Sequence, residues 1–398
     1  MKRWRRGSAA VAVAFLWACG DGVSPSDASG PGAPVDDTMD PNVGALMCTP
    51  SGVTSGWTFS RLGVGIKPAL AVGSDGTVHS AFMSEAQEGW TRYAQLGAGS
   101  QAVSSLATIS EGYFYGPLDL VLDGARSWVL YHDHDREDQV LAARVGSDWS
   151  LHPMPNSGHD GWYNAGTVGS GGALLTASYD PSGFGGVGVI YGVWDGSDWA
   201  IELAAAGSFD YTGGMAVVQT PDGSVHIAFF DDVAGEVKLA TLAGVDWTVA
   251  TVEPNEDALD VGYFPDMVVD PDGSTLHMVY LERATTSTGV IRYARGAPGA
   301  FEMMDVVEVT DFSGGARDVG TLDLDASGRP VIATQTKSEF TVMRLVDGAV
   351  QPIASFPAAE GITFGQQTEI EIDVQGRTHI VWWQSGEDPG TVCHAVSG

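Results

Sequence analysis

The sequence contains few basic residues and few cysteines. Its 398 residues include 19 Lys and Arg against 50 Asp and Glu, which gives a formal net charge of −31 at pH 7, and only three Cys. Such an acidic chain repels phosphate backbones and anionic lipid headgroups, so we expect no nucleic-acid partner and no binding to a bare membrane surface. Three cysteines are too few for a small disulfide-rich scaffold, so a hydrophobic core must hold this chain together.

Long hydrophobic runs and helical patterns are also missing. The longest apolar run, residues 9–17, is too short to span a membrane as a helix. The basic residues Lys2, Arg3, Arg5 and Arg6 precede it, and this order is typical of a secretory signal. No later stretch combines a helical period with capping residues, which favours an all-β protein.

The end of the apolar run, LWAC at residues 16–19, resembles the lipobox of bacterial lipoproteins. The resemblance implies a signal peptide at residues 1–18 and a lipid on Cys19, whereas the alternative is an ordinary signal peptide with a chance cysteine. Gly20 differs from the Asp of an inner-membrane retention signal, so if the cell is Gram-negative we expect the outer membrane or cell surface rather than the inner membrane. Residues 19–46 are rich in Gly, Pro, Ser and Asp, a composition that predicts a flexible acidic tether.

The main feature of the remaining sequence is a repeat of about fifty residues. Two clear copies are residues 213–253 and 265–308, each with an apolar strand, a tight turn, a second strand, an acidic loop and two further strands. Seven units of four short strands predict a seven-bladed β-propeller over residues 47–398. The turn glycines that mark the units are Gly76, Gly124, Gly172, Gly223, Gly273, Gly328 and Gly376.

The two ends of the repeat region complement each other. The last unit, from Thr368 to Gly398, contains three strands, and the missing fourth strand is found at the other end as GWTFSRLG, residues 56–63. We therefore expect the last blade to be closed by the N-terminal strand, which removes open sheet edges. This closure brings together Cys48 and Cys393, an even pair in an exported protein, and predicts a disulfide between them.

Histidines occur where metal sites or catalytic groups are often found. In YHDHDREDQ, residues 131–139, His132 and His134 would share one side of an extended loop, as zinc ligands can, but the sequence offers no third ligand. We expect a solvated acidic loop there, with no metal and no cofactor. His79, His226, His277 and His379 recur after the turn glycines, and such periodic residues indicate a structural role in each blade.

Aromatic and acidic residues recur in loops at one end of the predicted blades. Rings beside carboxylates can stack on sugar faces and bind hydroxyl groups, although such rings also pack between blades. The predicted ligand-binding residues are Tyr113, Tyr163, Tyr211, Tyr263, Asp133, Asp180, Asp231 and Glu282.

The repeat resembles that of sialidase-like and bacterial lectin-type propellers, with a turn of Asp-Gly type and a downstream Trp, although no intact Asp-box is present. The first hypothesis for function is a non-enzymatic propeller on the cell envelope that binds a glycan or a protein partner through loops around the channel. A glycosidase or lyase and a structural role in an envelope assembly are the alternatives. The enzyme hypothesis depends on carboxylates at the entrances of first strands, namely Asp119, Asp266, Asp318 and Glu369.

Overall fold

The structure is a computed structural model. It describes residues 48–50, 55–84, 90–110, 117–155, 161–181, 187–207, 213–256, 258–311, 320–385 and 390–398. Within these residues the chain forms 28 β-strands and no helix, as expected for an all-β protein, so none of the described residues belongs to a helix that could cross a membrane. The expected signal peptide (1–18), the tether (19–46) and Cys19 lie outside the described residues.

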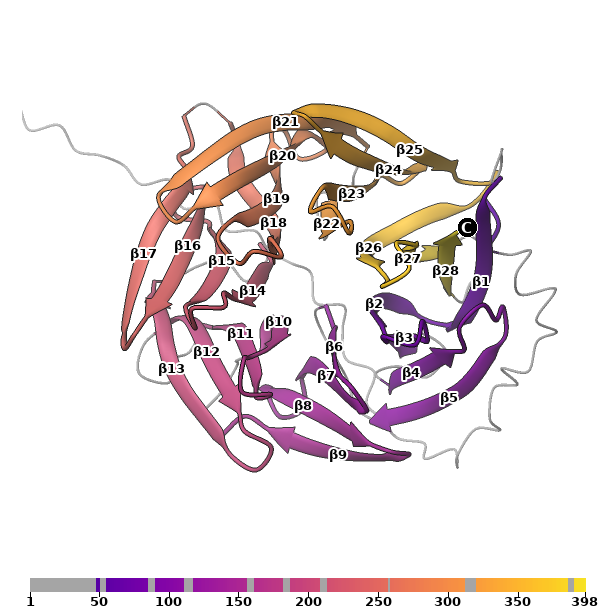
Figure 1. Ribbon diagram of the computed structural model, residues 1–398, viewed down its shortest axis with the longest axis horizontal. Coiled ribbons are helices and arrows are strands. Elements are labelled where there is room, and N and C mark those ends of the chain that lie inside the picture. The colour runs from indigo at the N-terminus through magenta and orange to yellow at the C-terminus, as the bar shows by residue number, and fades with distance from the viewer. Residues whose placement is uncertain are drawn as a thin grey trace, which may run out of the picture. The chain divides into compact units, whose positions relative to one another are not determined.

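The strands form seven antiparallel sheets of four strands each. Figure 1 shows these sheets as blades arranged in a ring, with the first strand of each blade nearest the axis, which confirms the predicted seven-bladed β-propeller. Blade 1 contains β2 (Ile66–Val72), β3 (Val78–Ser84), β4 (Trp90–Leu96) and β5 (Val103–Ser110). Blade 2 contains β6 (Asp119–Asp123), β7 (Arg126–Asp133), β8 (Asp138–Val145) and β9 (Asp148–Pro153). Blade 3 contains β10 (Trp162–Val168), β11 (Leu174–Asp180), β12 (Gly188–Trp194) and β13 (Trp199–Ala206).

The next three blades repeat this order. Blade 4 contains β14 (Met215–Gln219), β15 (Val225–Asp231), β16 (Glu236–Ala243) and β17 (Asp246–Glu253). Blade 5 contains β18 (Asp260–Val269), β19 (Leu276–Arg283), β20 (Thr288–Ala297) and β21 (Ala300–Thr310). Blade 6 contains β22 (Gly320–Leu324), β23 (Pro330–Gln335), β24 (Glu339–Val346) and β25 (Ala349–Pro357).

Blade 7 is built from both ends of the repeat region. Its order is β26 (Thr363–Ile372), β27 (Thr378–Ser385), β28 (Thr391–Ser397) and β1 (Trp57–Val64), with β1 antiparallel to β28. In Figure 1 the indigo β1 lies beside the yellow β28. The predicted closure by the N-terminal strand is therefore confirmed.

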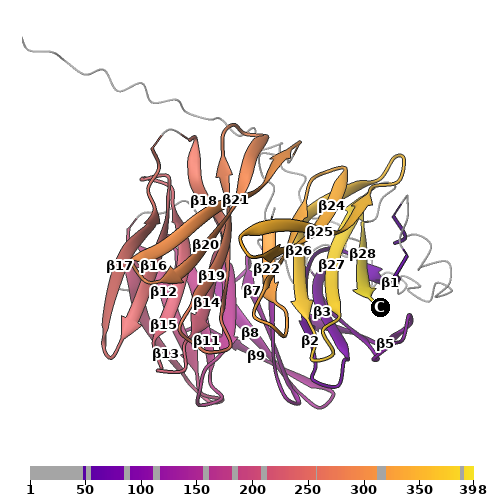
Figure 2. The ribbon, with the colours of Figure 1, turned by 45° about the horizontal axis from the view of Figure 1, so that its top comes forward.

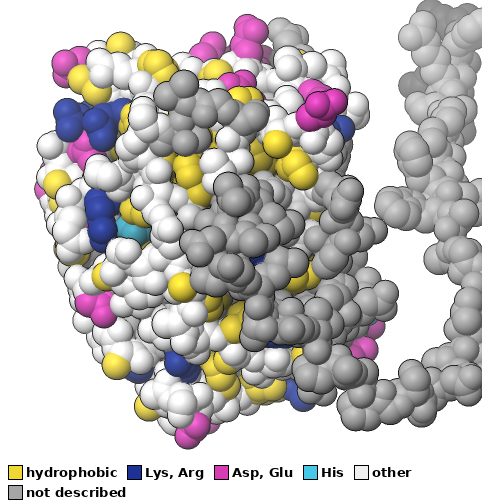
Figure 3. All heavy atoms as spheres, turned by 90° about the vertical axis from the view of Figure 1, so that its right-hand side faces the viewer, with side chains coloured by type: hydrophobic (Ala, Val, Ile, Leu, Met, Phe, Trp, Pro, Cys, Tyr) yellow, Lys and Arg dark blue, Asp and Glu magenta, His cyan; other side chains and the backbone are white. Residues whose placement is uncertain are grey.

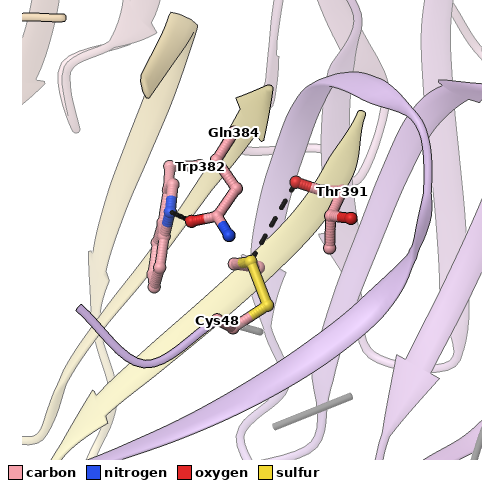
Figure 4. Close-up of a disulfide and its surroundings, with 5 residues drawn as sticks. Cys48, Trp382, Gln384 and Thr391 are labelled. Atoms are coloured by element: carbon pink, nitrogen blue, oxygen red, sulfur yellow. Dashed lines mark hydrogen bonds between the residues drawn. A yellow bond between two sulfur atoms is a disulfide. The ribbon is translucent and has the colours of Figure 1, made fainter. Parts of the chain in front are cut away.

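A disulfide reinforces this closure, as predicted. Cys48 and Cys393 are separated by 345 positions in the sequence, and their Cα atoms lie 5.5 Å apart. Figure 4 shows Cys48 reaching β28 from the segment that precedes β1, next to Trp382, Gln384 and Thr391. Both cysteines are at most 1% exposed, so the bond lies in the core of blade 7.

Aromatic residues join neighbouring blades. Trp149, which begins the fourth strand of blade 2, packs edge-on against Tyr93 of blade 1 with ring centroids 5.0 Å apart. Trp247 of blade 4 contacts Tyr191 of blade 3 in the same way, at 5.3 Å. These periodic tryptophans therefore pack between blades.

A β-bulge recurs where first strands enter the ring. The register of β2, β10, β18 and β26 shifts at this point, and a glycine in the left-handed region precedes the bulge in blades 3 and 5. A Cβ on Gly262 would lie 2.6 Å from the Cα of Val237, and one on Gly161 would lie 2.7 Å from the Cα of Gln139. Both neighbours belong to the third strand of the preceding blade, so glycine is required here for close backbone approach as well as for its φ angle.

Candidate functional site

The two ends of the propeller carry different connections between strands, and the tilted view in Figure 2 shows the strands running between these ends. The end that carries the loops between second and third strands, together with the entrances of first strands, is called the loop face. The opposite end carries the tight turns between first and second strands and between third and fourth strands, and it is called the turn face. Part of the propeller's side is seen in Figure 3, where Lys and Arg form small separate groups among acidic and hydrophobic side chains over the described surface.

The histidine-aspartate stretch begins inside the protein and ends in a loop on the loop face. His132 is 1% exposed, and its ring centroid lies 6.2 Å from that of His134. Asp133 shapes the loop, because its Oδ1 accepts the backbone N–H groups of Asp135 at 3.0 Å and Arg136 at 3.3 Å. Among the described residues, no three His, Cys, Asp or Glu side chains are placed to hold a metal ion.

The other predicted acidic residues also have partners within the protein. Asp231 accepts the N–H groups of Val233 and Ala234, both at 3.1 Å, and forms an ion pair with Lys238. Asp231 therefore forms in blade 4 the same turn that Asp133 forms in blade 2.

Glu282 and Asp180 complete the set of predicted acids. Glu282 pairs with Arg292 at 2.7 Å, and Asp180 is fully buried. A ligand-binding role for these four acids stays a prediction. Each acid would have to bind the ligand in addition to its structural role within the protein.

The predicted aromatic residues that the structure describes are buried. Tyr163 is 2% exposed and Tyr263 is 8% exposed. Tyr263 packs against Phe230 of blade 4, with ring centroids 4.6 Å apart, while the guanidinium of Arg283 lies 3.7 Å from its ring centroid. The structure thus places these two rings in the packing between blades, and their contact with a ligand stays a prediction. The other two predicted rings, Tyr113 and Tyr211, lie outside the described residues.

The periodic histidines have the structural role that the repeat indicated, and they bond the side chains of neighbouring residues. His277 Nδ1 lies 2.5 Å from the hydroxyl of Tyr293 on the third strand, and its Nε2 lies 3.4 Å from Asp270 Oδ2 in the preceding turn. His379 likewise joins Asp373 to His394, at 3.1 Å on each side. Burial lowers the pKa of all these imidazoles, that of His394 to about 3, which keeps them neutral and structural.

The central channel contains a cavity of about 510 Å³ lined by the first strands of all seven blades. Three of the hypothesised catalytic carboxylates, Asp119, Asp266 and Glu369, line it together, whereas Asp318 lies outside the described residues. Asp323 and Glu371, which were not predicted, also line the cavity. The signal for Glu371 was the alternation in TEIEI, residues 368–372, because Glu371 lies two residues after Glu369 and residues two apart on a strand face the same side.

These carboxylates join neighbouring blades through backbone hydrogen bonds. Asp119 accepts the N–H of Gly166 on blade 3 at 2.5 Å, and Asp266 accepts that of Leu322 on blade 6 at 2.8 Å. Asp323 in turn accepts the N–H of a residue on blade 7 at 2.6 Å. At the closing junction two glutamates act in parallel, since Glu369 and Glu371 accept the N–H groups of Leu70 and Val72 on blade 1 at 2.5 and 2.6 Å.

Burial raises the pKa values of four channel carboxylates, Asp119, Asp266, Asp323 and Glu371. Burial raises the pKa of Asp119 and of Asp323 to about 6, and the nearby Asp266 carboxylate adds to both shifts. The pKa of Glu371 rises to about 8, because burial and then the charge of Asp323 disfavour its ionised form. The predicted convergence of carboxylates near the axis is thus found, and their first chemical use is to hold blades together.

A second cavity, of about 520 Å³, forms a groove between blades 5 and 6 toward the turn face. Arg295 on β20 and Glu302 on β21 are exposed cross-strand neighbours in one wall, and Arg329 belongs to the other. Arg295 has no hydrogen bond or ion pair with the described residues, whereas Arg329 bonds Asp325 at 2.9 Å. Apolar surface comes from Met304, Pro330 and Leu345.

Comparison with known proteins shows similarity in structure only. No protein-family model and no curated protein matches the chain. Among solved structures, it is similar to SapL1 lectin in complex with α-methyl fucoside at 13% identity and a TM-score of 0.51, over 73% of this chain and 97% of that chain. AofleA from Arthrobotrys oligospora shows 11% identity and a TM-score of 0.52, over 79% and 98% of the two chains. The polysaccharide lyase Uly1 shows 11% identity and a TM-score of 0.54, over 89% and 95%. At these identities the likeness establishes a common fold and nothing more.

Proposed function

We propose that this propeller is a non-enzymatic glycan-binding protein and that the groove between blades 5 and 6 is its binding site. The observation that carries the proposal is the combination of Arg295, which is exposed and has no hydrogen bond or ion pair among the described residues, with the apolar surface of Met304 on the same face of the sheet. Sugar rings present hydroxyl groups that accept hydrogen bonds and C–H faces that pack on apolar atoms, so both parts of the groove have a use. A lectin bound to a fucoside is among the structures with this fold, which agrees with the proposal.

The groove also has a suitable size and a suitable rigidity. Its volume of about 520 Å³ lies within the range of small-ligand pockets and accommodates one or two sugar units. Its walls are two paired strands, β20 and β21, and the tight turns of blade 6 at Gly328 and Gly348. A site built on paired strands and short turns loses little conformational entropy on binding.

The test uses a glycan array probed with the purified protein, followed by titration of any glycan bound. Arg295→Ala should weaken binding about tenfold, as expected for the loss of a charged hydrogen bond. Arg136→Ala is the matched control, because it removes an arginine from the loop face next to Asp133. If Arg136→Ala weakens binding and Arg295→Ala does not, the site lies in the loops around the channel, where the sequence analysis placed it.

The enzyme alternative has one specific observation in its favour, the raised pKa of Asp119, Asp323 and Glu371 within one cavity. Against it, both carboxylate oxygens of Asp119 already accept backbone N–H groups, from Leu120 at 2.7 Å and Gly166 at 2.5 Å. Release of reducing ends from a bound glycan would establish turnover, and binding without release supports the non-enzymatic function.

The proposal includes attachment to the outer membrane or cell surface through a lipid on Cys19, on the basis of the LWAC motif. The wild-type protein should be found in the membrane fraction, and Cys19→Ser should move it to the soluble fraction, because a single thioether-linked anchor is lost. Fractionation of cells that express either form makes the comparison. Wild-type protein that is released into the medium as freely as the variant would contradict the anchor.

A further inference from the structure

All the charged side chains that line the central channel, among the described residues, are acidic. The described residues that line its cavity include Asp119, Asp266, Asp323, Glu369 and Glu371, and no Lys, Arg or His. Their hydrogen bonds to backbone N–H groups satisfy individual oxygens but do not neutralise the charge. A concave site that is lined by charges of one sign concentrates the electric field and attracts ions of the opposite sign.

Two buried amides supply a second and independent observation. Gln367 is 2% exposed and Asn164 is 7% exposed, and both line the cavity. The NH₂ group of Gln367 donates to the Leu118 carbonyl at 3.4 Å, and that of Asn164 donates to the Gly161 carbonyl at 2.7 Å. Because a carbonyl can only accept, these bonds fix which end of each amide is the oxygen.

The oxygens of these two amides have no hydrogen-bond partner in the part of the chain that the structure describes. Gln367 Oε1 and Asn164 Oδ1 are both buried and unsatisfied among the described residues. A buried acceptor without a donor costs about 1–3 kcal/mol, so two of them beside one cavity indicate that a donor is missing. The missing group must therefore donate hydrogen bonds, and the carboxylates favour one that is positively charged.

The need for a positively charged hydrogen-bond donor favours an ammonium group over a metal ion. A metal ion such as calcium would need several oxygen ligands around one point, and no three acidic or histidine side chains among the described residues converge in that way. An ammonium group brings its own N–H donors and suits ligands that are spread around a ring. The carboxylates also occupy two levels of the channel, since Glu369 and Glu371 are two residues apart on β26, about 7 Å along the strand.

We propose that the central channel binds an organic amine with two or more ammonium groups. One ammonium lies at the level of Asp119, Asp266 and Glu369, where it donates to the oxygens of Asn164 and Gln367. Another lies one step deeper, at the level of Asp323 and Glu371. A cavity of about 510 Å³ has room for a linear amine of this kind. This site is separate from the glycan groove, so neither proposal depends on the other.

Titration calorimetry of the purified full chain with spermidine tests the proposal, with a linear triol of similar length as the uncharged probe. Spermidine should bind with one-to-one stoichiometry, and the triol should not bind. Glu371→Gln and Asp323→Asn each remove a carboxylate that a bound ammonium would hold in its ionised form, although burial raises its pKa in the free protein. Both variants keep an acceptor for the backbone N–H and should weaken spermidine binding about tenfold. Glu308→Gln removes the same charge from an exposed position of β21 and should leave the affinity unchanged.

The outcomes are decisive because folding is checked on the same samples by thermal unfolding. Weaker binding by both channel variants, with unchanged binding by Glu308→Gln, supports the site. The absence of spermidine binding by the wild-type protein overturns the proposal. Equal weakening by all three variants also overturns it, because that result describes attraction to the acidic surface as a whole.

Discussion

Removal of the Cys48–Cys393 disulfide should lower the free energy of unfolding by about 4–5 kcal/mol. The bond joins residues 345 positions apart and therefore constrains almost the whole unfolded propeller chain. It also fastens the segment before β1 covalently to the blade that β1 completes, where hydrogen bonds to β28 and the packing of Phe59 otherwise hold the strand. Urea unfolding of the oxidised and reduced protein measures the difference, and thiol counting on denatured, unreduced protein should find neither cysteine free.

Single and double variants separate the cross-link from the packing of the cysteines. Cys48→Ala and Cys393→Ala break the same bond, so each should destabilise the protein by nearly the same amount, and the double variant should add little to either. Each variant also leaves a small cavity, because both side chains are at most 1% exposed, and that contribution persists under reducing conditions. Fully additive losses would show that packing, and not the cross-link, provides the stability.

Much of the fold could be predicted from the sequence because the propeller repeats. The turn glycines, the alternation in the strands and the incomplete last unit determine the number of blades, their strand order and the closure. The disulfide follows from the closure, since pairing β1 with β28 brings the segment before β1 to Cys393. These are properties of the backbone pattern, and they tolerate large changes in side chains.

The partners of individual side chains could not be predicted in the same way. Tyr263 is followed by Phe264 and Asp266 in a stretch that reads as an exposed loop, but a bulge turns this stretch inward and buries its rings. Whether a first-strand acid faces the axis depends on that bulge and on the register with the second strand. For this reason the sequence identified Asp119 and Glu369 at first-strand entrances but not Glu371, which the register brings to the same cavity.

The stability of the propeller should depend on pH through Glu371. Its pKa rises from 4.5 to about 8 on folding, so its stabilising contribution is fully present below pH 4.5 and is lost as the pH rises through 8. The raised pKa values of Asp119 and Asp323, about 6, act in the same direction but mainly below pH 6. Buried histidines act in the opposite direction, because their lowered pKa values remove stability as the pH falls below 6.5.

Because the contributions of Asp119, Asp323 and the buried histidines fall mainly at lower pH, we expect Glu371 to dominate the pH dependence of stability between pH 6.5 and 8. Asp119 and Asp323 lose their protons mainly below that interval, and His79 and His394, whose pKa values burial lowers, stay neutral within it. The free energy of unfolding should therefore fall by about 2 kcal/mol between pH 6.5 and pH 8, at about 1.4 kcal/mol for each pH unit over which the proton is lost. Urea unfolding across this interval should show the decline in the wild-type protein and in the Glu308→Gln surface control. Glu371→Gln should remove it, because glutamine cannot ionise yet can still accept the hydrogen bond from Val72. A decline of the same size in Glu371→Gln would contradict the prediction. It would mean that a group other than Glu371, which lies at the junction between blades 7 and 1, titrates in this interval.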